Sequence, residues 1–347
     1  MGPTAARVAL PRGRPYPRAV NLVFGPADRD SALTCLRGVV GALCPGGRPL
    51  DPVQHDVLAA VVGELWGLDA GPAGGAPQGP EGQGAARPAP GQHQPHVQLM
   101  VTLELLLHPL PPEVGDGVAA YADALGVQGG GVRAARLLAR DQLALMYACI
   151  QRNSWYPAET RRGIRHGQLY ELVRSKLAYY AVAEDAAIAD RWRALGDLPE
   201  GTWGRGVHQF YLDHGFPFPG ERHGIYEVGA KHDWVHVLTD YGTSPEGEID
   251  VFAFIAAAMD DPKGFVLLVV TLGIFQNGSV RHMFGRPIPA ACTDAMSAPG
   301  APQRFAEALH RGTQCTVDVL GGVDHFALAA EPLETVRERF HVLPRTR

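Results

Sequence analysis

The chain has 347 residues, of which 46% are hydrophobic, so it can form one large domain or two ordinary domains. Its formal net charge of −5 argues against a general nucleic-acid-binding protein. The five cysteines form no Cys-x-x-Cys pair, which favours a reducing compartment, and we expect a cytoplasmic location. No apolar run reaches the roughly 18 residues that a membrane-spanning helix requires. Because no amphipathic membrane helix is evident either, we expect any membrane association to be peripheral.

The first part of the chain predicts a tail and then a helical region. Residues 1–25 contain arginines, prolines and glycines but no acidic residue, and they predict a disordered basic tail. Residues 26–140 show helical periodicity, interrupted by a segment rich in Gly, Pro, Ala and Gln at 70–95 that predicts a disordered linker. The helices expected here are 30–43, 52–65, 97–107 and 113–125. This order loosely resembles TerB-like (tellurite-resistance) helical modules, although a plain helical bundle fits it equally.

The rest of the chain, residues 141–347, is also helical in its periodicity, and few runs alternate with the period of a strand. One long helix should cross the boundary, from residue 132 to residue 153. Two segments, 249–259 and 264–275, are apolar on nearly all sides and predict buried helices that could wall an apolar slot. The other helices expected are 169–177, 181–195, 202–214, 302–310 and 332–340. The predicted fold class is therefore all-α, a multi-helix bundle.

The segment 231–248 carries the clearest chemical signal in the chain. It contains four residues of metal-binding type, which are His232, Asp233, His236 and Glu248. At about 100° per residue, the first three share one face of a helix. The chain should then turn, and Ser244 as N-cap with Pro245 at the first position should begin a second helix that carries the glutamate. This helix–loop–helix predicts a site for divalent zinc, iron, manganese or magnesium. A polar helix face with one i,i+4 pair is the alternative.

Three runs of this chain resemble a known family. His-Asp-x-x-His followed by eleven residues and Glu is similar to the hallmark motif of the Coq-four family of ubiquinone (coenzyme Q) biosynthesis proteins. The run at 198–204, Leu-Pro-Glu-Gly-Thr-Trp-Gly, resembles the Leu-Pro-x-x-Thr-aromatic-Gly pattern of that family, and Phe210 supplies a following aromatic residue. The run at 332–337, Pro-Leu-Glu-Thr-Val-Arg, resembles its closing pattern. The resemblance covers roughly residues 145–345, so we expect 141–347 to form a Coq-four-like helical domain.

The resemblance implies a metal-binding enzyme that acts on a prenylated aromatic precursor of a quinone. The reaction it implies is oxidative decarboxylation, in which a hydroxyl group replaces the ring carboxyl group. The metal ligands would be His232, Asp233, His236 and Glu248, although Asp233 could instead orient an imidazole. Asp233 and Glu248 are the candidate catalytic residues. The expected partners are a prenylated quinone-type lipid, other biosynthetic enzymes at a membrane surface, and further copies of the chain in a homo-oligomer.

Two other functions are compatible with the sequence. The chain could bind a prenyl lipid without catalysis and act as a scaffold for biosynthetic enzymes, and turnover by the purified protein would distinguish the two functions. The pair His232–Asp233 also resembles the metal motif of HD-type phosphohydrolases, which need a further histidine and a further aspartate. The residues available for those roles are His166 or His208 and Asp294 or Asp318, but no spacing supports them. The extra N-terminal region leaves a related prenylated natural product open as the substrate.

Overall fold

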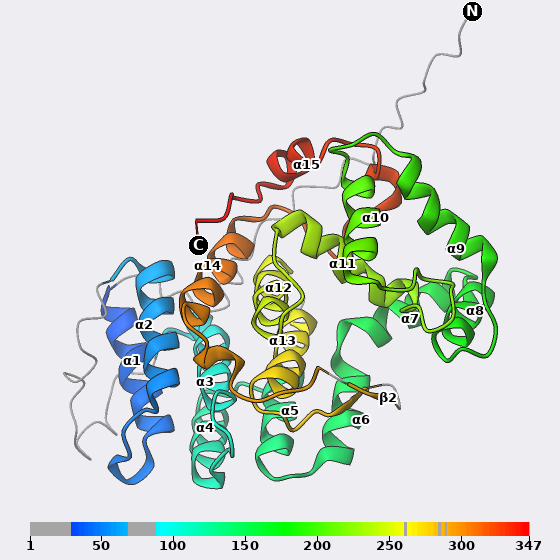
Figure 1. The fold of residues 1–347 in the computed structure, drawn as a ribbon. Helices are drawn as coiled ribbons and strands as arrows, with labels where there is room; N and C mark the ends of the chain where they lie inside the picture. The colour runs from blue at the N-terminus through cyan, green and yellow to red at the C-terminus, as the bar shows by residue number, and fades with distance from the viewer. Residues whose placement is uncertain (1–28, 69–87, 260–261, 284–285, 289, 347) are drawn as a thin grey trace, which may run out of the picture.

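The computed structural model describes residues 29–68, 88–259, 262–283, 286–288 and 290–346 (Figure 1). These residues form an all-α protein, as the periodicity predicts. The strands described are two residues long and pair as one antiparallel ribbon, β1 (His282–Met283) with β2 (Arg286–Pro287). The tail predicted at 1–25 lies outside the described residues, as does most of the linker predicted at 70–95. Within the described ranges, no helix combines the length and the apolar composition needed to span a bilayer.

The N-terminal part of the described chain forms five helices. They are α1 (Arg29–Leu43), α2 (Pro52–Trp66), α3 (His93–Glu104), α4 (Pro112–Ala124) and α5 (Gly130–Ala139). Helix α3 begins inside the predicted linker, so that prediction is wrong for residues 88–95. The reason is a tertiary contact, because the ring of His93 lies 3.0 Å from Leu125 O and 2.9 Å from Pro88 O. These contacts hold the start of α3 against the end of α4.

The remaining described helices follow in chain order. They are α6 (Leu143–Asn153), α7 (Trp155–Arg165), α8 (Leu169–Tyr179), α9 (Ala186–Arg193), α10 (Trp203–His214), α11 (Glu227–Thr239), α12 (Pro245–Ala258), α13 (Lys263–Phe275), α14 (Ala301–Gln314) and α15 (Leu333–Phe340). The single helix predicted over 132–153 is wrong, because α5 and α6 are separate helices. The chain turns between them where Asp141 adopts a left-handed φ of 53°. The periodicity also did not reveal α7.

One hydrophobic core joins the two regions that the sequence separates at residue 140. Figure 1 shows α12 and α13 at the centre, with α1 and α2 on one side and α7 to α9 on the other. Helix α12 packs on α13 and α14, while α14 packs on α2 and α13 packs on α3 and α5. The predicted burial of 264–275 is confirmed, since every residue of that range is buried. This packing makes α12 a rigid support for the residues at its first turn.

Candidate metal centre

Helices α11 and α12 bring three side chains of metal-binding type together. One ligand atom from each of His232, His236 and Glu248 lies within 4.8 Å of the other two. No other group of this kind occurs among the residues that the structure describes. The protein therefore contains a His–His–Glu group that could hold a metal ion, on the predicted helix–loop–helix. The fourth predicted ligand, Asp233, does not belong to this group.

The local sequence explains how the two helices meet. Helix α11 ends where Asp240 adopts a left-handed φ of 62°. Helix α12 begins where Ser244 Oγ accepts a hydrogen bond from Gly247 N–H at 3.3 Å. Position 247 must be glycine, because a Cβ there would clash with the carbonyl oxygen of Gly242. This close approach places Glu248 in the first turn of α12, opposite the histidines of α11.

Three arginines bind the main-chain carbonyl oxygens at the C-terminal end of α11. Arg337 binds Val237 O and Leu238 O, Arg311 binds Thr239 O, and Arg345 binds Asp240 O. The last carbonyls of a helix have no partner inside the helix, and they favour a cation. Arg337 closes the sequence run at 332–337. The last residue of that run therefore helps to anchor the helix that carries the histidines.

Hydrogen bonds to main-chain carbonyls fix both imidazole rings. His232 Nδ1 lies 2.6 Å from Gly229 O, and His236 Nδ1 lies 3.0 Å from Tyr241 O. Because a carbonyl oxygen only accepts, Nδ1 carries a proton on each ring, and Nε2 is the nitrogen that faces the group. Metal-binding histidines in proteins commonly have this tautomer, with the second ring nitrogen held by a carbonyl or a carboxylate.

The contact between His236 and Glu248 requires a positive charge. His236 Nε2 is buried, has no hydrogen-bond partner and lies 3.3 Å from Glu248 Oε1. Two electron pairs at this distance repel each other unless a proton or a metal ion lies between them. Two ligand atoms that are each about 2.0–2.1 Å from a tetrahedral zinc ion lie about 3.3 Å apart. The side chains present therefore fit a divalent metal ion.

The pKa values of these two residues have the same cause. Burial would lower the pKa of His236, but the facing Glu248 carboxylate raises it above its ordinary value. Burial would raise the pKa of Glu248, but His236 and His232 lower it below its ordinary value. Each group therefore stabilises the charged form of the other. A proton and a metal ion compete for the same position between them.

Asp233 lies beside the group and accepts a hydrogen bond from Tyr211. Tyr211 Oη donates to Asp233 Oδ2 at 2.5 Å, and Asp233 Oδ1 lies 3.2 Å from His232 Nε2. Burial raises the pKa of Asp233, although the nearby His232 opposes this rise. Burial and the Asp233 carboxylate raise the pKa of Tyr211 well above its ordinary value, so Tyr211 remains a donor. Because Asp233 Oδ1 faces Nε2, the ring nitrogen on the side of the group, while Gly229 O holds Nδ1, the geometry is compatible with both roles expected for Asp233.

Aromatic rings cover both imidazoles. Phe210 of α10 stacks on His236 with ring centroids 5.4 Å apart, and Phe252 of α12 stacks on His232 at 5.5 Å. Stacked rings restrict the rotation of the imidazoles and exclude water from their faces. Phe252 follows Glu248 by four residues, so both occupy the same face of α12. This four-residue spacing is the only feature of the sequence that indicates that Phe252 lies beside the metal ligands.

Two tyrosines beside the group were not identified from the sequence. Tyr156 comes from α7, and burial together with nearby acidic groups, including Glu248, raises its pKa well above its ordinary value. Tyr211 comes from α10 and lies 22 residues before Asp233 in the chain. No local pattern connects either tyrosine with the metal motif. They reach the site only through the packing of helices.

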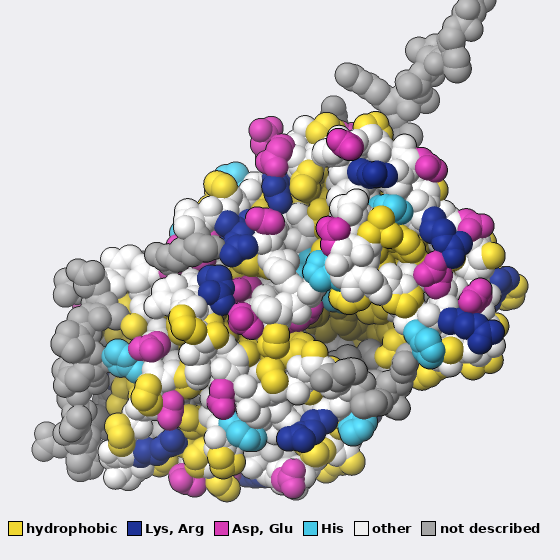
Figure 2. Space-filling model, in the orientation of Figure 1, with side chains coloured by type: hydrophobic (Ala, Val, Ile, Leu, Met, Phe, Trp, Pro, Cys, Tyr) yellow, Lys and Arg dark blue, Asp and Glu magenta, His cyan; other side chains and the backbone are white. Residues whose placement is uncertain are grey.

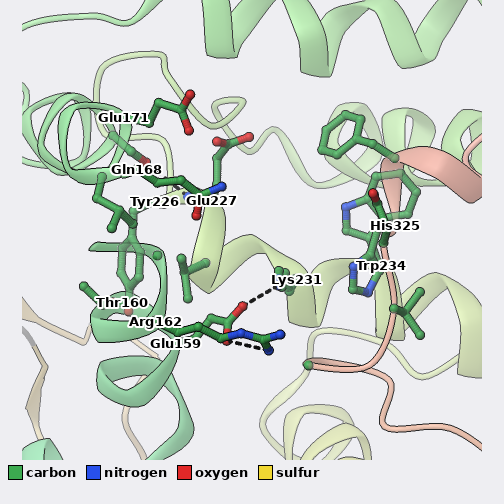
Figure 3. Close-up of a pocket in the computed structure, with 18 of the residues that line it drawn as sticks. Glu159, Thr160, Arg162, Gln168, Glu171, Tyr226, Glu227, Lys231, Trp234 and His325 are labelled. Atoms are coloured by element: carbon green, nitrogen blue, oxygen red, sulfur yellow. Dashed lines mark hydrogen bonds and ion pairs between the residues drawn. The ribbon is translucent and has the colours of Figure 1, made fainter. Parts of the chain in front are cut away.

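A separate cavity of about 450 Å³ lies against the opposite side of α11. Lys231 and Trp234 line it, and at 100° per residue they occupy the helix face opposite His232 and His236. Figure 3 shows Lys231 directed toward Glu159, with which it forms an ion pair at 3.3 Å. No member of the His–His–Glu group lines this cavity. The cavity is therefore not an entrance to the metal centre.

The residues considered for an HD-type phosphohydrolase do not join the group. Neither His166 nor His208 belongs to it, and neither do Asp294 and Asp318. His208 stacks on the ring of Phe218 at 5.2 Å. Asp318 accepts hydrogen bonds from two main-chain N–H groups of the turn that follows it. The described geometry therefore gives no support to that function.

No protein-family model matches this chain, and no curated protein matches its sequence. The fold and the site alone therefore define the class. It is an all-α protein with a His–His–Glu group that could hold a metal ion.

Proposed function

We propose that this protein is a divalent-metal-dependent enzyme that acts on a prenylated aromatic substrate, as the resemblance to the Coq-four family implies. The observation that carries the proposal is the 3.3 Å contact between His236 Nε2 and Glu248 Oε1. This contact places a lone pair against a carboxylate in a buried site whose histidine tautomers are already fixed. Such an arrangement is costly unless a proton or a metal ion lies between the two groups, and the His–His–Glu geometry suits a metal ion.

His232, His236 and Glu248 would hold the ion. When bound, a divalent ion supplies Lewis-acid polarisation of a substrate oxygen and lowers the pKa of bound water. Two imidazoles and one carboxylate suit zinc, iron or manganese better than magnesium, which prefers oxygen ligands. Because the proposed reaction transfers electrons, iron or manganese is the better match. We therefore propose iron or manganese as the bound metal.

The protein side chains would control protons and water around the ion. Tyr211 keeps its proton and holds Asp233 against His232. We assign Asp233 as the candidate general base, because its Oδ1 lies beside His232 Nε2 on the side of the His–His–Glu group. Glu248 keeps its negative charge, since its pKa is lowered. The rings of Phe210 and Phe252 exclude water from the imidazoles.

The proposed reaction replaces a ring carboxyl group with a hydroxyl group. The carbon–carbon bond to the carboxyl group breaks and carbon dioxide leaves, while water supplies the new hydroxyl group. This exchange releases two electrons and two protons, which dioxygen accepts to form hydrogen peroxide. The protein must therefore bind the aromatic ring near the metal and admit dioxygen as the co-substrate.

A hydrophobic hollow supports a substrate with an apolar chain. Figure 2 shows that the visible face is hollowed between the region of α7 and α11 and the β1–β2 ribbon, and that hydrophobic side chains border the hollow. Helices α12 and α13, which form the centre of the fold, are buried along nearly their whole length. An isoprenoid chain would gain about 0.8 kcal/mol for each methylene group that it buries in such a site.

Elemental analysis of the purified protein tests the proposal, with His236→Ala as the test variant and His166→Ala as the control. We expect about one equivalent of iron, manganese or zinc in the wild type and the control, and none in His236→Ala. Turnover of a prenylated hydroxybenzoate, measured by release of carbon dioxide, tests the reaction. Metal binding without turnover would favour the scaffold function. Equal metal content in His236→Ala and the wild type would contradict the metal centre itself.

A further inference from the structure

The C-terminal end of α10 carries an exposed histidine, His214, beside the candidate metal centre. Helix α10 packs on α11 (Figure 1), and its Phe210 is the ring that stacks on His236. The same phenyl ring contacts His214, with ring centroids 4.5 Å apart. One ring therefore contacts both a buried imidazole of the metal centre and an imidazole that is exposed to solvent.

Two aromatic rings hold the His214 side chain in place. Gly215 ends α10 with a left-handed φ of 65°, and the chain turns back so that Phe216 N–H binds Tyr211 O. This turn stacks Phe216 on His214, with ring centroids 5.3 Å apart and ring planes 24° apart. The imidazole therefore contacts both Phe210 and Phe216, and these contacts restrict its rotation although it is exposed.

The hydrogen bond of the His214 ring uses one nitrogen and leaves the other open. Nδ1 lies 2.8 Å from Phe210 O, and because a carbonyl oxygen only accepts, Nδ1 carries a proton. Nε2 forms no hydrogen bond within the part of the chain that the structure describes. In the rings of His232 and His236, a main-chain oxygen likewise holds Nδ1. His214 thus presents to solvent the nitrogen through which its neutral ring can bind a metal ion.

The metal centre meets solvent through Glu248 and His232, not through His236. The side chain of His236 is 0% exposed, whereas those of Glu248 and His232 are 17% and 15% exposed. His214 lies near this opening, because its charge acts on Glu248. Burial raises the pKa of Glu248, but His236 and, more weakly, His214 lower it below its ordinary value. Since Coulomb interactions weaken with distance, an exposed imidazole and a partly exposed ligand carboxylate lie close to each other.

We propose that His214 is the entry ligand of the metal centre, which binds a divalent cation from solvent through Nε2 and passes it to Glu248. This inference rests on the metal centre of the proposed function but not on the proposed reaction. A cation that loses its water before it reaches protein ligands is costly to bury, so an imidazole at the opening lowers the barrier to entry. His214 does not belong to the His–His–Glu group, so it would contact the cation during entry and exit only.

Two other roles for His214 are distinguishable from this one. A protonated histidine in the last turn of a helix stabilises the helix dipole, and Nδ1 binds a carbonyl of that turn. This structural role would affect the stability of α10 but not the rate of metal binding. A ring that only covers the opening would slow entry, so its removal would make metal binding faster. An entry ligand predicts the opposite, because its removal makes metal binding slower.

Stopped-flow binding of cobalt(II) to the metal-free full chain, followed by the visible absorbance of the bound ion, tests the proposal. The first variant, His214→Ala, removes the ring. The second, His214→Gln, keeps a long polar side chain beside Phe210 but has no imidazole nitrogen. His166→Ala is the control, because His166 is also exposed and also lies outside the His–His–Glu group. Circular dichroism checks that all three variants fold.

We expect both His214 variants to bind cobalt(II) at least about fivefold more slowly than the wild type and the control. Dissociation should slow by the same factor, so the equilibrium affinity should stay within about twofold of the wild type. Wild-type association rates in both variants, or faster association in His214→Ala, would refute the entry role. Weaker equilibrium binding would also refute it, since His214 would then act on the bound state. A wild type that binds no cobalt(II) would instead refute the metal centre, and with it the proposed function.

Discussion

Arg311 donates a hydrogen bond from Nη1 to the main-chain oxygen of Thr239 at 3.0 Å, although the two residues are 72 positions apart. Arg311 is buried, and its guanidinium also lies 5.0 Å from the ring centroid of Tyr241. Its Nε donates to Leu343 O at 2.8 Å. One side chain of α14 therefore joins the end of α11, the loop before α12 and the C-terminal segment. This connection ties the helix that carries the two histidines to the loop that leads to Glu248.

Replacement of Arg311 by methionine should destabilise the fold. The substitution leaves the buried carbonyl group of Thr239 and the partly buried one of Leu343 without their donor, which costs about 2–4 kcal/mol of the free energy of unfolding. Arg339→Met is the control, since Arg339 is exposed and has one surface ion pair with Glu331 at 3.6 Å. Urea denaturation measures both variants. Equal midpoints for the two variants would show that Arg311 does not hold α11 in place.

Replacement of Tyr211 by phenylalanine should weaken metal binding without removing a ligand. Asp233 would lose the hydrogen bond that holds its carboxylate beside His232. Loss of a hydrogen bond that orients a carboxylate beside a metal site typically lowers metal affinity about 10- to 100-fold. Competition with a chelator measures the affinity, and Tyr170→Phe on the exposed side of α8 is the control. An unchanged affinity in Tyr211→Phe would mean that the position of Asp233 does not matter for metal binding.

Two glycines in the α11–α12 connection should differ in their tolerance of alanine. A Cβ at Gly247 would clash with Gly242 O, whereas a Cβ at Gly242 would meet nothing within 4 Å. Gly247→Ala should therefore displace the first turn of α12 and lower metal affinity by at least about tenfold, while Gly242→Ala should bind normally. Isothermal titration with zinc compares the two. Normal binding by Gly247→Ala would show that the position of Glu248 tolerates movement.

Glu104 should make the protein less stable as the pH rises. Its side chain is buried, its Oε1 has no hydrogen-bond partner, and burial raises its pKa from 4.5 to about 8, against the opposing charge of Arg136. The native state therefore holds this proton more tightly than the unfolded state. The resulting stabilisation is complete below pH 4.5 and is lost as the pH rises through about 8.

Glu104→Gln removes this dependence because glutamine is neutral and has nearly the same shape. Relative to that variant, the wild type should lose about 2–4 kcal/mol of the free energy of unfolding between pH 5 and pH 8. Urea denaturation at both pH values measures the difference. Glu113→Gln, in the exposed first turn of α4, is the control and should follow the wild type. Parallel pH profiles for wild type and Glu104→Gln would refute this account.

The helix–loop–helix that carries the candidate metal ligands was predictable because its signals are local. Ser244 and Pro245 define the start of α12 by capping and by a fixed φ, and these preferences act within a few residues. The positions of His232 and His236 on one face follow from the helical repeat alone. The proximity of these two histidines and Glu248 could therefore be predicted from residues 231–248 alone.

The rest depended on contacts between distant segments. The turn at Asp141 was hidden because the apolar periodicity continues from α5 into α6. The sequence predicted helix α8 but not the exposure of its apolar side. A periodic apolar stripe indicates a helix, but it does not show whether that stripe is buried. The buried side of α8 carries only small residues, Ser175 and Ala178. Similarly, nothing near Tyr211 in the sequence indicates that it binds Asp233.

The arginines at the end of α11 also set an order of events during synthesis. Arg311, Arg337 and Arg345 follow the carbonyl groups that they bind by 72, 99 and 105 residues. When Glu248 has just left the exit tunnel of the ribosome, the arginines that hold the end of α11 have therefore not all been translated. The nascent histidines and glutamate can meet a metal ion at that stage, but the helix that presents them still has a frayed end. Full metal affinity should develop only after translation has passed Arg345.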